Sequence, residues 1–493
     1  MTASVTLGLD VGTQGTKALI VDVERGEVIG RGHASYGLIE GLGEGHMEQH
    51  PSTWIDAIQS AVRAAGEDAE TAGHTGALQR VEGIGVSGQQ HGAVLLDASH
   101  RPVRAAKLWC DTSTAAEAKR VSESLGRAIP SGFTAPKLRY VADREPDVWA
   151  STAHAMLPHD FVNLWLTGEV WTEPGDASGT GYLSDSSDAY LGADLLETVA
   201  PDLGRRLPRI VPSVSIGAPL RRSAAEALGL REGIGVSGGG GDNMMSAIGS
   251  GATSPGVVTC SLGTSGTVFA YSTKAVLDPG GAIAAFRSSS ETDASAAGHL
   301  PLLCIMNCTE VLNRVCSLTG RTHDELTLAA SKVPFGADGL LLLPYLVGER
   351  VPDLPDARAS LTGLTDRTLN PAHLYRAALE GVSLGLSFGL DRMRELGLEV
   401  GQVRLVGGAA GNLLWRQILA DLFDCRVDLV LETETAALGG ALQAASALGG
   451  NDLDALAARI AAVSGDAAAP RAASFDAAAE LRARFNEESA RRS

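Results

Sequence analysis

The chain has 493 residues, which is too long for one ordinary hydrophobic core and predicts at least two domains. Its 40 basic and 58 acidic residues leave a net charge of −18, which argues against a nucleic-acid binder that follows phosphates with a basic face. The N-terminus lacks the basic and apolar regions of a secretory signal, and no apolar run is long enough to span a membrane. We therefore expect a cytoplasmic protein.

The N-terminal segments predict an α/β domain. Three β-like runs come first: VTLGLDVG, TKALIVDV and GEVIGRGHASY. A helical pattern, WIDAIQSAVRAAGEDAE, separates them from two further strand-like runs, VEGIGVSG and GAVLLD. Strands that alternate with helices indicate a sheet covered by helices, and the first two runs are spaced as a hairpin.

Further along the chain, residues 115–235 are rich in helical patterns and contain WTEPGDASGTGYLSD, which predicts a loop. A helix is expected to begin at Asp242. The C-terminal half adds a long helix, LYRAALEGVSLGLSFGLDRM, then a strand, VRLVGG, and a helix from about Asn412 to Phe423.

An internal repeat relates the start of the chain to its middle. The segment from Asp10 to Thr16, DVGTQGT, is echoed by Ser261 to Thr267, SLGTSGT, and each copy lies between two apolar runs. A repeat of this kind predicts two similar domains, each opening with a strand–turn–strand hairpin. Two such hairpins facing each other across a cleft would hold a triphosphate from both sides.

Both repeats have the composition of phosphate-binding loops. Glycine lets the backbone approach phosphate oxygens, and backbone N–H groups and threonine hydroxyls donate to them. The spacing differs from the Walker A pattern, and a second strand follows where that motif requires a helix. The predicted ATP-binding residues are Gly12, Thr13, Gln14, Gly15, Thr16 and Lys17 in the first loop, and Gly263, Thr264, Ser265, Gly266 and Thr267 in the second.

Two aspartates are predicted to be catalytic. Asp10 ends an apolar strand, where Mg²⁺ would be a natural partner for its charge; the alternative is an aspartate that caps its own turn. Asp242 follows four glycines at the expected start of a helix. It is predicted to be the general base that accepts the proton of the attacking hydroxyl, kept ionised by the helix N-terminus. The alternative is a simple helix cap.

Polar and aromatic residues after the strand-like runs suit a sugar. Gln90 and His91 in GQQHG, with Trp109 and Asp111 in LWCDTST, offer hydrogen-bonding groups and an aromatic face, although each has an equally plausible structural role. Near the C-terminus, VGGAAGN places small residues at a strand-to-helix turn. Gly407, Gly408, Ala409 and Asn412 are predicted to accept the adenosine of ATP, and an ordinary β–α turn is the alternative.

Taken in order, these segments resemble the FGGY family of carbohydrate kinases, and its xylulokinase branch most closely. The resemblance also rests on GFTAPKL, LPHDFVNLWLTGE, GDASGT, LPYLVGERVP, ALEGV and VGGAAGNLLWRQILAD, and it spans nearly the whole chain. It implies two actin/Hsp70-like (ribonuclease H-like) ATPase domains with a cleft between them, residues 1–245 and 246–493. It also implies that Asp242 is the base, that Asn243 contacts the substrate, and that Asp10 lies at the magnesium–phosphate centre. The implied reaction converts D-xylulose and MgATP into D-xylulose 5-phosphate and ADP.

Three departures from the family pattern concern the sugar. Gln90 replaces a methionine found in some relatives, WCDTST replaces a WND-type sequence, and the stretch before GFTAPKL is short. The alternatives are therefore a kinase for D-ribulose, another ketopentose or a polyol. An actin/Hsp70-like ATPase without a sugar substrate and a catalytically dead sugar sensor are further alternatives. A homodimer is a family-level expectation only.

Overall fold

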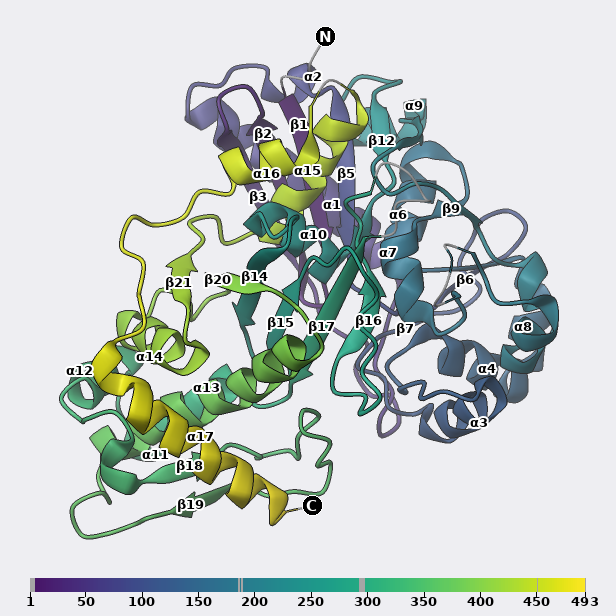
Figure 1. Cartoon of the computed structure of the whole chain (residues 1–493). Helices are drawn as coiled ribbons and strands as arrows, with labels where there is room; N and C mark the ends of the chain where they lie inside the picture. The colour runs from purple at the N-terminus through teal and green to yellow at the C-terminus, as the bar shows by residue number, and fades with distance from the viewer. Residues whose placement is uncertain (1–4, 185–186, 188, 292–297, 450, 493) are drawn as a thin grey trace. The chain divides into compact units, whose positions relative to one another are not determined.

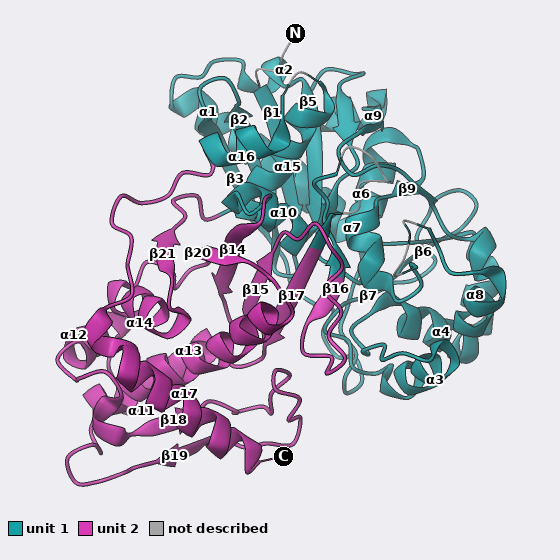
Figure 2. Cartoon of the chain, in the orientation of Figure 1, with its two compact units in different colours: residues 1–253, 286–299, 434–460 teal, residues 254–285, 300–433, 461–493 magenta. Residues whose placement is uncertain are grey.

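The computed structural model of the chain describes residues 5–184, 187, 189–291, 298–449 and 451–492. The chain divides into two compact units, coloured separately in Figure 2. Unit 1 comprises residues 1–253, 286–299 and 434–460, and unit 2 comprises residues 254–285, 300–433 and 461–493. In the described part of the chain, no helix is long and apolar enough to cross a membrane.

Unit 1 is built on a sheet with the strand order β11–β12–β5–β1–β2–β3, and β13 also pairs with β5. The strands are β1 (Val5–Val11), β2 (Gly15–Asp22), β3 (Glu27–Ser35), β5 (Gly83–Gly88), β11 (Ile216–Pro219), β12 (Gly235–Ser237) and β13 (Gly240–Gly241). Strands β1, β2 and β3 are antiparallel neighbours, whereas β5 runs parallel to β1 and β12 runs parallel to β5. The predicted N-terminal strands and hairpin are confirmed.

The helices of unit 1 follow the apolar patterns of the sequence. The larger ones are α1 (Pro51–Thr71), α3 (Ala115–Leu125), α4 (Thr134–Arg144), α6 (Pro158–Thr167), α10 (Asp242–Ser250) and α15 (Thr435–Ala447). Shorter ones are α2 (Ala77–Arg80), α5 (Pro146–Ser151), α7 (Pro174–Ala177), α8 (Ala193–Val199), α9 (Arg222–Leu228), α16 (Leu453–Ile460), η1 (Ser178–Thr180) and η2 (Leu203–Arg205). Three short strand pairs complete the unit: β4 (Glu48–Gln49) with β7 (Ala106–Lys107), β6 (Val94–Leu96) with β8 (His154–Met156), and β9 (Trp171–Thr172) with β10 (Arg209–Ile210).

The prediction of a loop at WTEPGDASGTGYLSD is wrong for part of the segment. Residues 171–180 form β9, α7 and η1, while the last residue of the segment, Asp185, lies outside the described residues. The reason lies in buried side chains: Glu173 accepts hydrogen bonds from the backbone N–H groups of Gly175 and Asp176, which closes a helical turn despite the glycine.

Unit 2 repeats the strand arrangement of unit 1. Its main sheet has the order β16–β17–β15–β14–β20–β21. The strands are β14 (Gly256–Leu262), β15 (Gly266–Ala270), β16 (Ala284–Arg287), β17 (His299–Ile305), β20 (Val400–Val406) and β21 (Arg426–Leu429). Here too a hairpin and a third strand are antiparallel, and two parallel strands follow on the other side. The matching order, β17–β15–β14–β20–β21 against β3–β2–β1–β5–β12, confirms the predicted duplication.

The remaining elements of unit 2 pack around a core that includes Trp415 and Tyr375. They are α11 (Thr309–Thr319), α12 (His323–Ala330), α13 (Pro371–Glu395), α14 (Leu413–Phe423), α17 (Phe475–Ala490), η3 (Ala337–Gly339), η4 (Ala472–Ser474) and the pair β18 (Leu341–Leu343) with β19 (Ser360–Thr362). The predicted long helix, strand and C-terminal helix correspond to α13, β20 and α14, all labelled in Figure 1.

Candidate functional site

Side chains of unit 1 donate hydrogen bonds to the backbone carbonyls of the first glycine-rich loop. Tyr36 Oη donates to the carbonyl of Gly12 over 2.7 Å, and Gln49 Nε2 donates to the carbonyl of Thr13 over 2.7 Å. Gln14 at the tip is exposed. Because the loop carbonyls are engaged by the protein, the tip presents a rigid backbone to an incoming anion.

Asp10 and Lys17 lie opposite each other in the β1–β2 register. One Asp10 oxygen accepts a hydrogen bond from Ser87 Oγ over 2.9 Å, and the other lies 3.7 Å from Lys17 Nζ. Burial raises the pKa of Asp10, and Lys17 opposes that shift. Lys17 is in turn 2.8 Å from Glu434, so one ammonium is shared between two carboxylates.

Asp242 is the first residue of α10 and is half-buried. Its Oδ1 accepts hydrogen bonds from the backbone N–H and from Nδ2 of Asn243, over 2.8 and 2.9 Å. Burial, followed by the nearby carboxylates of Asp10 and Asp176, raises the pKa of Asp242 to about 7. The expectation that the helix N-terminus keeps this aspartate ionised is therefore wrong below about pH 7, since desolvation and like charge outweigh the helix dipole.

Asn243 and Gln90 lie close to this carboxylate, and His91 follows Gln90 in the chain. Asn243 Nδ2 also donates to Gln90 Oε1 over 2.9 Å, so the predicted base and two predicted sugar contacts form one hydrogen-bonded group. His91 has a φ of 63°, a left-handed conformation that is uncommon outside glycine and is often found at binding sites. Its ring stacks on Phe133 at 4.8 Å between centroids.

Trp109, one of the predicted sugar contacts, hydrogen-bonds to the first glycine-rich loop. Its indole N–H donates to Thr13 Oγ1 over 2.9 Å, while 40% of the residue is exposed. The hydroxyl of Thr13 donates to Gln89 Oε1 over 3.1 Å. Trp109 is thus a partly exposed aromatic side chain beside the first glycine-rich loop.

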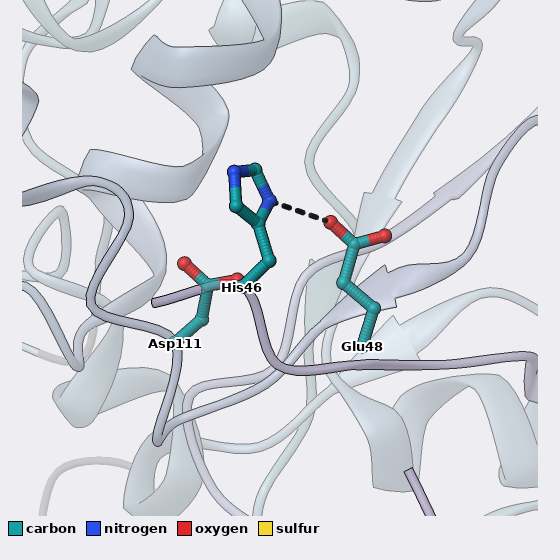
Figure 3. A group of neighbouring side chains, drawn as sticks. All are labelled: His46, Glu48 and Asp111. Carbon is teal, nitrogen blue, oxygen red and sulfur yellow. Dashed lines mark ion pairs between the residues drawn. The ribbon is translucent and has the colours of Figure 1, made fainter. Parts of the chain in front are cut away.

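Asp111 is buried and belongs to a cluster of charged side chains. Figure 3 shows it with His46 and Glu48, a group whose ligand atoms lie within 4.8 Å of one another. Lys107 Nζ lies 3.1 Å from both Asp111 and Glu48, and 3.2 Å from His46 Nδ1. An ammonium thus takes the place that a metal ion would need, and Asp111, with no exposed surface, holds the loop that carries Trp109.

The carbonyls of the second glycine-rich loop, in unit 2, also accept hydrogen bonds from the protein. Thr309 donates its backbone N–H and its hydroxyl to the carbonyl of Gly263, over 3.0 and 2.8 Å, and the N–H of Cys308 donates to the carbonyl of Thr264. The two hairpins differ by one residue in register: Leu262 pairs with Gly266, whereas Val11 pairs with Thr16. The two repeats are therefore anchored in the same way, but the turn between the paired strands is one residue shorter in the second.

The predicted adenosine segment follows β20 in the same unit. Gly407 has a φ of 94°, and a Cβ there would lie 2.7 Å from the carbonyl oxygen of Leu262, so only glycine fits against the start of the second loop. Asn412 caps α14 by accepting the N–H of Trp415 over 3.1 Å, and it donates to Thr327 Oγ1. Gly408 faces open space.

A buried group of charges in unit 1 escaped the sequence interpretation. His159, Asp160, Glu173 and Asp176 are all at most 1% exposed, and Asp176 lies beside Gln90 and Gly241. The motifs LPHDFVNLWLTGE and GDASGT contain three of them, and the charged residues His159 and Asp160 inside the apolar first motif were the available signal. The positions of the two motifs along the sequence did not predict that they would be in contact in the fold.

The carboxylate of Asp10 fits a magnesium ion. Magnesium prefers oxygen ligands, and a cation beside Asp10 would offset the negative charge by which Asp10 raises the pKa of Asp242. Lys17 counters the pKa rise at both aspartates.

Comparisons with known proteins decide the family. Residues 5–249 match the N-terminal domain of the FGGY family of carbohydrate kinases, and residues 258–448 match its C-terminal domain. A xylulose kinase of Haemophilus influenzae is 41% identical over 460 residues, covering 91% of this chain and 92% of that protein. The chain belongs to the FGGY family of carbohydrate kinases.

Other FGGY relatives agree over most of their length. A xylulose kinase of Streptomyces coelicolor is 36% identical over 92% of this chain and 90% of its own. The crystal structure of a xyloylose kinase from Brucella ovis has a TM-score of 0.89 at 31% identity and covers 98% of each chain. Family membership confirms the predicted fold class of two actin-like, ribonuclease H-like domains. It also confirms an ATP-dependent sugar kinase over an ATPase without a sugar substrate.

Proposed function

We propose that this FGGY kinase transfers the γ-phosphoryl group of ATP to D-xylulose and forms D-xylulose 5-phosphate. Relatives described as xylulose kinases align over nine tenths of the chain and support this substrate. The observation that carries the chemistry is the position of Asp242, half-buried at the start of α10 with a pKa raised to about 7.

A base with that pKa suits the reaction. General bases are most effective when their pKa lies near the working pH. In the proposed step, the sugar hydroxyl donates its hydrogen bond to Asp242, and its oxygen forms a bond to the γ-phosphorus while the bond to the ADP oxygen breaks. The hydroxyl proton passes to Asp242 and leaves with solvent after product release.

The neighbouring residues would hold the sugar. Gln90, His91 and Asn243 supply fixed hydrogen-bonding groups, and Trp109 supplies an aromatic face. Asp111 remains a predicted sugar contact, but its buried pairing with Lys107 favours a supporting role for the Trp109 loop.

The two glycine-rich loops would bind the phosphates of ATP, with Lys17 near the first. Magnesium, held at Asp10, would neutralise charge on the phosphates during transfer. The residues Gly407, Gly408, Ala409 and Asn412 would receive the adenosine, with Asn412 also capping α14. The homodimer and the cytoplasmic location stay predictions.

A substrate panel tests the proposal. ADP release would be followed with ATP and Mg²⁺ against D-xylulose, D-ribulose, L-ribulose, L-xylulose, glycerol and gluconate. We expect the highest kcat/KM with D-xylulose. A clear preference for another member would overturn the substrate and place the specificity in the departures around Gln90, WCDTST and GFTAPKL.

Asp242→Asn is the matched control for the chemistry. The variant keeps the shape and loses the base, so kcat is expected to fall at least about 10²-fold while ATP affinity stays the same. Weakened ATP binding in this variant would contradict the sugar-side assignment of Asp242.

A further inference from the structure

The segment GFTAPKL, residues 132–138 of unit 1, packs against His91, one of the predicted sugar contacts. The imidazole of His91 stacks on the ring of Phe133, with 4.8 Å between the ring centroids and 25° between the ring planes. The hydroxyl of Thr134 donates a hydrogen bond to the backbone carbonyl of His91 over 3.2 Å. Two consecutive residues of the segment therefore contact the side chain and the backbone of the same histidine.

The backbone of His91 adopts a conformation that needs support from its neighbours. Its φ of 63° lies in the left-handed region, which is unfavourable for a residue with a side chain and persists where surrounding contacts enforce it. A Cβ on Gly179 would lie 2.3 Å from His91 Cε1 and 2.5 Å from Nδ1, so this edge of the ring lies against the backbone of Gly179. Contacts with Phe133, Thr134 and Gly179 thus set the position of the imidazole.

Lys137 holds the turn that carries Phe133. Its Nζ donates hydrogen bonds to the carbonyls of Ser131, Gly132 and Phe133, over 3.2, 2.6 and 2.8 Å. Lys137 has no exposed surface and is the fourth residue of α4, near the helix end where the dipole disfavours a cation. Burial lowers the pKa of Lys137 to about 7, and the charge of Asp111 opposes this shift. The three hydrogen bonds account for a lysine at so unfavourable a position.

The turn of residues 131–133 also packs against the loop of Trp109. A Cβ on Gly132 would lie 3.0 Å from the carbonyl oxygen of Trp109, and Thr114 Oγ1 donates to the carbonyl of Ser131 over 3.3 Å. The turn therefore lies between this loop and His91. Because both sides are occupied, a change in the shape of the turn would displace Phe133 relative to His91.

We propose that Lys137 is a positioning residue of the sugar side: it holds the carbonyls of residues 131–133, and thereby places Phe133 and Thr134 against His91 and fixes the imidazole for the sugar. The proposal rests on the proposed role of His91 as a sugar contact. Lys137 is completely buried, so it acts through His91 and does not touch the sugar itself.

Variants of the segment test this role with D-xylulose and MgATP. Lys137→Met keeps an unbranched side chain and removes the donors, and Phe133→Leu removes the stacked ring. We expect both to lower kcat/KM for the sugar at least about tenfold, since misplacement of a binding group by about 1 Å can cost up to about 10²-fold. KM for ATP should stay unchanged. Thr134→Val should also lower kcat/KM for the sugar, whereas Thr134→Ser, which keeps the hydroxyl, should retain it.

A double-mutant cycle shows whether Phe133 acts through His91. His91→Ala removes the imidazole, so Phe133→Leu should cause no further fall in kcat/KM for the sugar when it is added to His91→Ala. Falls that simply multiply would show that Phe133 acts by another route, which would overturn the proposal.

The same cycle separates the positioning role from the proposed function. If His91→Ala leaves kcat/KM for the sugar unchanged, His91 is not a sugar contact, and the positioning role fails with that assignment. If His91→Ala lowers kcat/KM but Lys137→Met and Phe133→Leu do not, the positioning role alone is refuted.

Phe485→Leu is the control for a loss of stability without a loss of positioning. Phe485 is a buried ring of unit 2 that packs edge-on against Tyr345, with 6.3 Å between centroids. This variant should lower the melting temperature and leave kcat/KM for the sugar unchanged. Should Lys137→Met fail to fold, Lys137→Gln, whose shorter side chain offers two N–H donors, takes its place with a fall in the same direction expected. An unchanged kcat/KM in Lys137→Gln would overturn the proposal.

Discussion

At the scale of single residues, Asp242 shows how its surroundings set the ionisation of a side chain. A helix N-terminus favours a carboxylate by about 0.3–1 kcal/mol at exposed positions. Burial and two neighbouring carboxylates act in the opposite direction and prevail, which raises the pKa to about 7. One pKa unit corresponds to about 1.4 kcal/mol, so a rise of this size exceeds the helix contribution.

This pKa predicts the pH dependence of the reaction. The base must be ionised to accept a proton, and a raised pKa means that ionisation is lost as the pH falls through about 7. We expect kcat/KM for the sugar to be constant above that pH and to fall tenfold per unit below it. Initial rates between pH 5.5 and 9, with saturating MgATP, measure this. A profile that stays flat down to pH 5.5 would contradict the assignment.

At the scale of elements, close packing of helices positions Asp242. Helices α10 and α15 approach so closely that a Cβ on Gly439 would lie 1.9 Å from the carbonyl oxygen of Met245, and one on Gly249 would lie 1.9 Å from that of Thr435. Ser246 and Thr435 hydroxyls hydrogen-bond across the same contact at 2.7 Å. The pair fixes the axis of α10 and with it the direction of its first residue.

The substitution Gly439→Ala tests whether the close packing of α10 and α15 is needed for stability and for the position of Asp242. Alanine favours a helix over glycine by about 1 kcal/mol, but a contact of 1.9 Å with backbone forces the helices apart at a cost of about 1–3 kcal/mol or more. We expect a lower free energy of unfolding in urea and a reduced kcat/KM for the sugar. Gly465→Ala, at an exposed glycine with nothing within 4 Å, should change neither quantity. If Gly439→Ala has the stability of the wild type, α10 and α15 can move apart without a cost in free energy, and the prediction is wrong.

The strands, the two hairpins and the helices that follow apolar patterns could be predicted from the sequence, because periodicity and turn chemistry are local. The one-residue difference in register between the hairpins could not, because both repeats have the same length in the sequence. Nor could the pairing of His159 with Asp176 or of Asp111 with Lys107, since both depend on which segments meet. For the same reason the ionisation of Asp242 was misjudged: the carboxylates that raise its pKa come from distant segments, Asp10 from β1 and Asp176 from α7.

At the scale of the whole molecule, the compact units are not continuous pieces of chain. The family models leave a gap between residues 249 and 258, but unit 1 also contains residues 286–299 and 434–460. Helix α15, in the last of these segments, packs on β1, β2 and β5, and the hydroxyl of Thr6 donates a hydrogen bond to the carbonyl of Ala441 over 2.9 Å. The division at residues 245 and 246 stays a prediction about family domains.

This arrangement predicts that residues 1–253 alone do not form a stable fold. Without α15, the sheet loses the cover of residues such as Leu438 and Leu442, both at most 1% exposed. Each buried leucine contributes about 1.5–3 kcal/mol, so the loss rivals the 5–15 kcal/mol that stabilises a typical domain. A second fragment should recover the fold: residues 1–253 joined to 434–460 by a short flexible linker, which suffices because Ser246 and Thr435 are in contact. Near-ultraviolet circular dichroism and urea titration compare the two fragments. We expect a cooperative transition only in the joined fragment, and equal midpoints in both would show that α15 is dispensable to the fold of unit 1.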